Sequence, residues 1–127
     1  LKNDIKTMPG LKSAFPTLKN YKLAIVTEES RDLTDAKLEA LGLAKNFQII
    51  LTSDDIGAMK PDERYYKKAF ARLKVLPSEC LVVGDSYHKD LAIPKKLGAA
   101  VVCIGESREA DYSIKSYRSF LRILGRI

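Results

Sequence analysis

Short, almost wholly apolar runs alternate along the chain with longer stretches in which apolar residues recur every three or four positions. Four of these runs predict buried strands, over residues 22–27, 47–51, 80–85 and 99–104. A fifth, shorter run over residues 110–114 predicts an edge strand. Strands that are apolar throughout are typical of parallel sheets, because helices cover both of their faces. The pattern therefore predicts an α/β fold, a parallel sheet with helices on both faces.

The stretches between the runs have the spacing of amphipathic helices. Residues 61–75 predict a helix with Pro61 in its first turn. Thr34 is expected to cap an earlier helix that stops at Gly42. The apolar face of the helix over residues 61–75 consists of Tyr66, Ala69, Phe70 and Leu73. The last helix carries one apolar face made of Tyr117, Phe120, Leu121 and Leu124.

The composition is that of an ordinary globular chain. Its 127 residues are 46% hydrophobic, enough for one domain with a core, and no stretch approaches the roughly 18 apolar residues of a membrane span. The formal net charge of +6 is dispersed, so a solvated surface is favoured over a nucleic-acid site, and attraction of a small anion fits equally well. Cys80 and Cys103 lie in apolar runs without disulfide or metal spacing. We expect a cytoplasmic protein that binds neither membrane nor nucleic acid.

Polar side chains gather at the ends of three predicted strands. The first strand ends at Thr27, and the second leads through a polar loop to Lys60. The third ends at Asp85, with Ser86 next and Asp90 a turn later. Because ligands bind beyond the carboxyl ends of the strands in parallel sheets, we expect these side chains to share one rim.

A hydroxyl, an ammonium and two carboxylates suit phosphoryl chemistry, which needs donors, positive charge and a metal ion held by acidic side chains. Thr27 can donate a hydrogen bond to a phosphate oxygen, and Lys60 can neutralise its charge. Asp85 can ligate Mg²⁺, while Asp90 can orient a metal-bound water or pair with Lys60. The set predicts a magnesium-assisted site for a small phosphorylated substrate.

Each of these residues also has a purely structural interpretation. Thr27 can be a turn residue, and Lys60 a solvated loop lysine. Asp85 can cap the helix that follows, and Asp90 can be an early-helix acid. Gly84 directly before Asp85, and a second acid five residues later, strengthen the functional interpretation. Four other acids are expected on the loop surface: Glu28, Glu29, Asp54 and Asp55.

The order of these motifs resembles the haloacid dehalogenase-like hydrolase superfamily. Residues 9–30 look like the segment with that family's second motif, and Thr27 stands where its hydroxyl residue stands. Residues 53–102 resemble its third and fourth motifs, and residues 110–124 are similar to its closing strand and helix. The positions that match the third and fourth motifs are Lys60, Asp85 and Asp90, with Gly84 and Ser86 completing a Gly-Asp-Ser block.

This resemblance implies a Rossmann-like parallel sheet and, for most members, a Mg²⁺-dependent phosphatase. The family's first motif, a strand ending Asp-x-Asp, supplies the nucleophile and the acid. No Asp-x-Asp triplet occurs in these 127 residues, so by resemblance the nucleophile is not in this chain. Residues 1–10 are then expected to be a connector from an upstream or cap region, and residues 11–127 a partial core domain.

By the same resemblance, the central first strand of the sheet is expected to be missing between the strands at 22–27 and 80–85. Each buried unpaired backbone group costs roughly 1–3 kcal/mol, so a whole row exceeds the stability of a small domain. Three arrangements avoid that cost. An upstream segment or second chain supplies the strand, the two strands pair directly in a smaller sheet, or a neighbouring copy donates a strand. The first is favoured.

The expected function is a Mg²⁺-dependent phosphatase of small phosphorylated metabolites, catalytic only when an upstream Asp-x-Asp segment completes it. One alternative is a catalytically inactive binding or structural module, which the absent nucleophile favours. Another is a metal-independent 2-haloacid dehalogenase, against which the Gly-Asp-Ser block argues.

Overall fold

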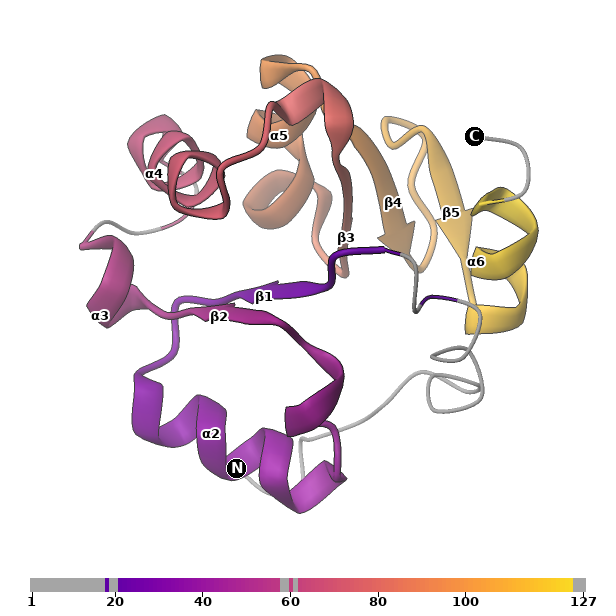
Figure 1. Ribbon diagram of the computed structural model, residues 1–127. Coiled ribbons are helices and arrows are strands. Elements are labelled where there is room, and N and C mark those ends of the chain that lie inside the picture. Colours follow the sequence, from indigo (N-terminus) through magenta and orange to yellow (C-terminus); the bar gives the residue numbers. More distant parts are fainter. Residues whose placement is uncertain (1–17, 19–20, 58–59, 61, 125–127) are drawn as a thin grey trace.

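Figure 1 shows the computed structural model, which describes residue 18, residues 21–57, residue 60 and residues 62–124. The strands are β1 (Ala24–Val26), β2 (Ile49–Leu51), β3 (Leu81–Gly84), β4 (Ala100–Ile104) and β5 (Tyr112–Ile114). The α-helices are α2 (Arg31–Leu41), α3 (Ser53–Ile56), α4 (Glu63–Leu73), α5 (Ala92–Leu97) and α6 (Tyr117–Leu124). Single turns are the 3₁₀ turns η2 (Ala44–Asn46) and η3 (Pro77–Glu79), and the π-helical turn η4 (Tyr87–Leu91).

The predicted α/β fold with parallel strands is confirmed. Every predicted strand is present, although each is shorter than its apolar run, and every pairing is parallel. The predicted connector over residues 1–10 and the predicted first-turn Pro61 lie outside the described residues.

The strands form two separate parts. β1 pairs with β2, and β4 lies between β3 and β5 (Figure 1). Within the described residues β1 and β3 do not pair with each other. Of the three arrangements expected for a missing central strand, direct pairing in a smaller sheet is therefore not the one adopted.

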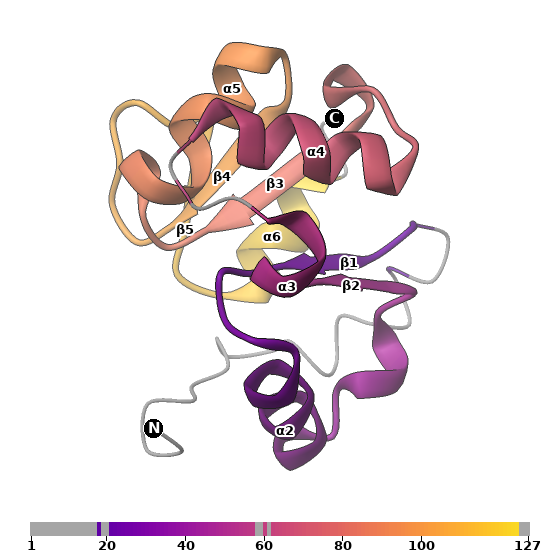
Figure 2. The same cartoon turned by 90° about the vertical axis from the view of Figure 1, so that its left-hand side faces the viewer.

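Strand β3 shows why its residues are apolar throughout. Val82 packs against the core cluster that contains Tyr66 and Phe70 of α4. Its neighbours Leu81 and Val83 pack against a second cluster, built around Phe120 and Ile123 of α6. Because successive side chains of a strand point to opposite faces, both faces of β3 are covered by helices. Figure 2 shows α4 and α5 on one side of β3–β4–β5 and α6 on the other.

Helix α2 begins one turn earlier than its predicted cap. Ser30 is the N-cap, since its side chain accepts a hydrogen bond from the backbone N–H of Leu33. Thr34 is buried inside the helix, and its hydroxyl donates to the carbonyl of Ser30 at 2.9 Å. The prediction of Thr34 as the cap is therefore wrong, because Ser30 satisfies the first turn instead. The predicted stop at Gly42 is confirmed, with φ of 70°.

Helix α4 has the predicted apolar face. The four predicted core residues belong to or pack against one cluster: Tyr66, Ala69, Phe70 and Leu73. Tyr65 belongs to the same cluster and is fully buried. Asp62 caps the helix by accepting from the N–H of Arg64 at 2.8 Å. The first turns of α4 thus place two adjacent tyrosines in the interior.

Both cysteines are free thiols, and burial raises the pKa of each. Cys103 is buried on β4 and Cys80 is half-buried just before β3. In the part of the chain that the structure describes, no helix combines the length and the apolar character needed to cross a membrane.

Candidate functional site

Lys60 lies between the carboxyl ends of β1 and β3. Its Nζ donates to the carbonyl oxygen of Val26, at 3.4 Å, and to Oδ1 of Asp90, at 3.1 Å. The side chains of Lys60 and Asp90 are only 14% and 18% exposed, so their ion pair is weakly screened by solvent. One ammonium group therefore connects the last residue of β1 to the turn that follows β3.

Thr27 follows Val26 directly and is held in a tight turn. Its backbone N–H donates to Leu51 on β2 at 3.0 Å, and its Oγ1 accepts from the N–H of Glu29 at 3.2 Å. The turn interpretation of Thr27 is thus confirmed. It does not exclude a functional one, because a hydroxyl that accepts one hydrogen bond can still donate its own proton.

The turn after β3 is built around Asp90. Oδ2 of Asp90 accepts from the backbone N–H of Ser86 at 3.2 Å, and the N–H of Asp90 donates to the carbonyl of Ser86 at 2.8 Å. Gly84 is needed here, because a Cβ at this position would lie 2.6 Å from Cβ of Asp90. The predicted Gly-Asp-Ser block is therefore a close-packed turn that fixes the Asp90 carboxylate beside Lys60.

The turn also tests the capping interpretation of Asp85. Ser86 is the N-cap of η4, with its side chain accepting from the N–H of Lys89 at 3.3 Å. Asp85 is exposed, and within the described residues no group donates a hydrogen bond to its carboxylate. The capping interpretation of Asp85 is therefore wrong, and its carboxylate is available to a ligand. Asp90 lies in a π-helical turn, a feature that occurs frequently at functional sites.

These contacts bring the predicted residues to one rim. Lys60 and Asp90 touch directly, and Thr27 follows the residue whose carbonyl Lys60 contacts. Asp85 follows Gly84, which packs on Asp90. Thr27, Lys60 and Asp85 thus lie at the carboxyl ends of β1 and β3, although within the described residues no contact joins the Thr27 hydroxyl or the Asp85 carboxylate to Lys60.

The acidic side chains of this rim allow a test of fit for Mg²⁺. Across the described ranges there is no group of three or more His, Cys, Asp or Glu side chains that could hold a metal ion by itself. Mg²⁺ is commonly bound through one or two carboxylates, with waters and substrate phosphate completing its shell. Asp85 fits the role of one such carboxylate, whereas Asp90 is already engaged by Lys60 and the Ser86 N–H.

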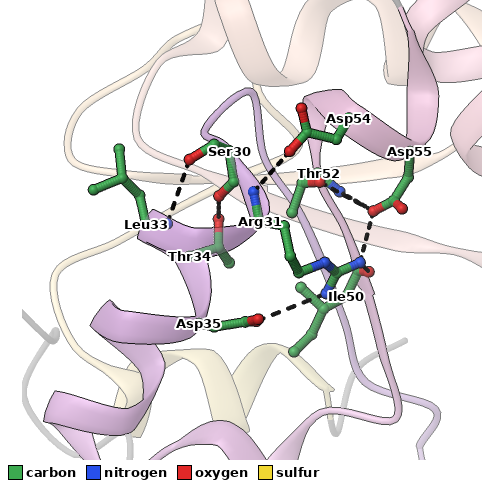
Figure 3. A network of polar contacts seen from close by, with 9 residues as sticks. All are labelled: Ser30, Arg31, Leu33, Thr34, Asp35, Ile50, Thr52, Asp54 and Asp55. Atoms are coloured by element: carbon green, nitrogen blue, oxygen red, sulfur yellow. Dashed lines mark hydrogen bonds and ion pairs between the residues drawn. The ribbon is translucent and has the colours of Figure 1, made fainter.

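A polar network that the sequence analysis missed fixes the loop next to Thr27 (Figure 3). The guanidinium of Arg31, at the start of α2, donates to the carbonyl of Ile50 at 2.8 Å and to Oδ2 of Asp55 at 2.7 Å. That same oxygen accepts from the backbone N–H of Thr52 at 2.8 Å, and this bond is the largest cause of the lowered pKa of Asp55. The expectation that Asp55 is a surface loop acid is therefore wrong. The signal was present, because Thr-x-x-acid at the start of α3 is a capping-box pattern.

Glu28 was also assigned to the loop surface. Its carboxylate instead pairs with Nζ of Lys89 on η4 at 3.4 Å, and its side chain is only 21% exposed. The pair is a second link between the β1 end and the turn after β3. No local pattern indicates this pair, since the two residues lie 61 positions apart in the sequence.

A cleft of about 920 Å³ lies between the two-stranded and three-stranded parts, and Lys60, Asp85 and Asp90 belong to its lining. Ala24 and Val26 of β1 line one side, and residues 81–84 of β3 line the other. Among the described residues each of these strands pairs on one edge only, β1 with β2 and β3 with β4. The remaining lining is largely apolar, and α4 and α6 contribute Tyr66, Ala69, Phe70, Leu73, Phe120 and Leu124 to it.

Parallel strands covered by helices, with polar side chains collected at their carboxyl ends, are typical of α/β proteins, which commonly bind ligands beyond the strand tips. The chain belongs to the haloacid dehalogenase-like hydrolase family, whose profile matches residues 1–104. The resemblance noted from the motifs is thereby confirmed.

Individual relatives agree with this assignment. The chain is 31% identical over 129 residues to the pyrophosphatase PpaX of Bacillus velezensis, covering 94% of this chain and 57% of that protein. It is 35% identical over 82 residues to a phosphoserine phosphatase of Thermus thermophilus, covering 65% of this chain and 33% of that protein. A solved structure of a haloacid dehalogenase-type phosphatase from Thermococcus onnurineus superposes with a TM-score of 0.84 at 31% identity, covering 94% and 59% of the two chains. The chain therefore spans between 33% and 59% of the length of these relatives.

Proposed function

We propose that this chain is the phosphate-holding part of a Mg²⁺-dependent phosphohydrolase that acts on small phosphorylated metabolites in the cytoplasm. The observation that carries the proposal is the place of Lys60, whose ammonium joins the ends of β1 and β3 beside Asp90. Phosphatases among the relatives support the same reaction class.

Each residue at the rim has a distinct part in this proposal. Lys60 neutralises the charge of a phosphate, and the burial of most of its side chain strengthens that interaction. Thr27 donates its hydroxyl proton to a phosphate oxygen. Asp90 holds Lys60 in place, with Gly84 and Ser86 shaping the turn around it.

Asp85 is the proposed ligand for Mg²⁺. When bound, the metal supplies charge stabilisation to the phosphoryl oxygens. The exposed carboxylate of Asp85 at the end of β3 suits a site that a substrate phosphate also completes.

The nucleophile comes from outside these residues in this proposal. The cleft between β1 and β3 is flanked by two strands that each belong to a parallel pair and have one unpaired edge in the described structure. A single apolar strand would pair with both edges and bury its side chains against α4 and α6. A segment of this kind ending in Asp-x-Asp would deliver carboxylates to the rim beside Lys60. We favour an upstream segment or a second chain as its source over a strand donated by a neighbouring copy.

The test is a phosphatase assay of the full-length gene product, with Mg²⁺ and a generic phosphate ester. We expect Asp85→Ala to lower turnover by about a hundredfold or more, because the metal site loses its ligand on β3. The matched control is Glu39→Ala, which removes an exposed carboxylate in the last turn of α2, the end of the helix farther along the chain from Thr27. Unchanged turnover in Asp85→Ala would count decisively against the proposal.

A second candidate is a non-catalytic module that binds phosphate. The absence of an Asp-x-Asp triplet from the 127 residues favours it. It predicts phosphate binding without turnover in the same assay, and an Asp-x-Asp strand encoded upstream in the gene would discard it. A metal-independent dehalogenase would release halide without Mg²⁺, and the close-packed Gly-Asp-Ser turn gives it less support.

A further inference from the structure

Of the two adjacent tyrosines at the start of α4, Tyr65 faces the ammonium of Lys60 and Tyr66 bonds the residue before Asp90. We infer that Tyr65 is a positioning residue for the Lys60 ammonium, and that Tyr66 supports it by fixing the turn that carries Asp90. The kinetic part of this inference rests on the proposed phosphatase function, whereas the placement of Lys60 does not.

The first contact is between Lys60 and the Tyr65 ring. Nζ of Lys60 lies 5.7 Å from the ring centroid of Tyr65, within the range of a cation–π interaction. Lys60 thus has three kinds of partner around one ammonium: the carbonyl of Val26, the carboxylate of Asp90 and the ring of Tyr65. A flexible lysine side chain is thereby held at the end of β1.

The Tyr65 ring is itself immobilised by packing. Its side chain is fully buried, and its ring meets that of Tyr66 edge to face at 5.1 Å and 78°. Both belong to the core cluster that includes Ala69 and Phe70 of the same helix. A rigid ring is a suitable support, because a functional group is held accurately only when its neighbours are locked.

The Tyr65 hydroxyl takes no part in holding Lys60, so the effect of the ring can be tested apart from hydrogen bonding. It is buried and has no hydrogen-bond partner among the described residues. Burial raises its pKa, and the charges of Glu28 and Asp90 add to the effect, so the hydroxyl stays neutral. Because this hydroxyl makes no bond, replacing Tyr65 by Phe keeps the ring beneath Lys60 and loses no hydrogen bond.

Tyr66 acts on the other partner of the ion pair. Its hydroxyl donates to the backbone carbonyl of Lys89, the residue before Asp90. Burial raises the pKa of Tyr66 as well, which keeps it a donor. The π-helical turn is thereby attached to α4 at the position where it must hold Asp90 toward Lys60.

The experiment compares Tyr65→Leu, Tyr65→Phe and Tyr66→Phe in the full-length gene product. With a generic phosphate ester, we expect Tyr65→Leu to raise KM roughly three- to thirtyfold, the factor that corresponds to the energy of a cation–π interaction. We expect kcat to change less than about twofold. Tyr65→Phe is expected to keep the wild-type KM. Tyr66→Phe is expected to raise KM by a smaller factor than Tyr65→Leu does. Tyr112→Leu removes a partly buried tyrosine ring on β5, in another core cluster, and controls for lost packing.

A spectroscopic measurement reads the placement of Lys60 without catalysis. A methylene next to an ammonium that faces an aromatic ring has proton signals shifted upfield by the ring current. We expect this shift for the Cε protons of Lys60 in the wild type and in Tyr65→Phe, and its loss in Tyr65→Leu, with Lys60→Arg assigning the signal.

The outcomes are decisive in both directions. Unshifted Lys60 signals in the wild type, or a shift that survives Tyr65→Leu, overturn the inference. So does a Tyr65→Leu enzyme whose kinetic constants change no more than those of Tyr112→Leu. If the wild type hydrolyses no phosphate ester, the proposed function fails, while the ring-current shift still decides whether Tyr65 places Lys60.

Discussion

The space beside Gly84 controls the position of Asp90, and through it that of Lys60. Any side chain at residue 84 would meet Cβ of Asp90 at 2.6 Å and its Oδ2 at 2.9 Å, contacts that folded proteins do not tolerate. Asp90 accepts from both Lys60 and the Ser86 N–H, so it cannot move without breaking those bonds. The glycine is therefore required by close approach and not by an unusual backbone angle.

We expect Gly84→Ala to destabilise the protein by about 1–3 kcal/mol, the usual cost of forcing extra atoms into a packed site. The urea midpoint of unfolding measures this change. Asp90→Gly should relieve the clash, so that the double variant loses less than the sum of the two single changes. Strict additivity of the two changes would contradict the proposed contact.

At the scale of elements, the Arg31 network ties the start of α2 to the end of β2 and the first turn of α3 (Figure 3). Arg31→Met removes a charge-assisted pair and a bond to a strand carbonyl. We expect a loss of about 1–2 kcal/mol in the free energy of unfolding, below the full value for charged hydrogen bonds because Arg31 is partly exposed.

Arg64→Met provides a matched control for this loss. Arg64 also pairs with an aspartate at 2.7 Å, but its side chain is 79% exposed. Exposed ion pairs contribute little, so this change is expected to stay within about 0.5 kcal/mol. Equal effects of the two substitutions would show that the Arg31 network is only a surface pair.

The same network predicts a dependence of stability on pH. The hydrogen bond from Thr52 holds the pKa of Asp55 below its ordinary value of 3.8. A lowered folded-state pKa contributes stability above the unfolded-state value, and this contribution is lost as the pH falls through the folded-state pKa. Asp55→Asn should therefore be less stable than the wild type near pH 7, and the difference should shrink below about pH 4. A difference that stays constant from pH 7 to about pH 3 would contradict this role of Asp55.

At the scale of the whole molecule, a strand that fills the cleft between β1 and β3 is expected to cover the side chains that line it and to protect them from chemical labelling. Cys80 lines this cleft and is half-buried, whereas Cys103 is buried on β4. In a Cys103→Ser background, and in buffer where a cooperative urea transition shows that residues 1–127 alone are folded, we expect Cys80 to react with a thiol reagent at least about tenfold faster in these residues alone than in the full-length gene product, because a strand in the cleft covers it. Equal labelling rates would mean that the cleft is not a strand site.

The sheet and its covering helices could be predicted because continuous apolar runs and helical spacing are properties of neighbouring residues. The places of Thr27 and Asp85 directly after strands were predictable for the same reason, whereas their sharing of one phosphate site stays a prediction. Sequence could not separate Ser86 from Asp85 as the cap of η4, because both residue types suit that position.

The contacts of the two tyrosines were not predictable either. Tyr66 was expected in the core of α4, and helical spacing cannot show that its hydroxyl reaches Lys89 or that the Tyr65 ring faces Lys60. Such contacts depend on how elements distant in the sequence pack together. The Asp55 network was the exception, because its capping-box pattern is local.

The most direct test of the account is a crystal structure of the full-length gene product with tungstate, a phosphate mimic, and Mg²⁺. We expect the oxyanion at the strand tips, within hydrogen-bonding distance of Nζ of Lys60 and Oγ1 of Thr27, with the metal on Asp85. An oxyanion bound elsewhere, with Lys60 and Thr27 both turned away from it, would contradict the claim that these strand ends hold one phosphate.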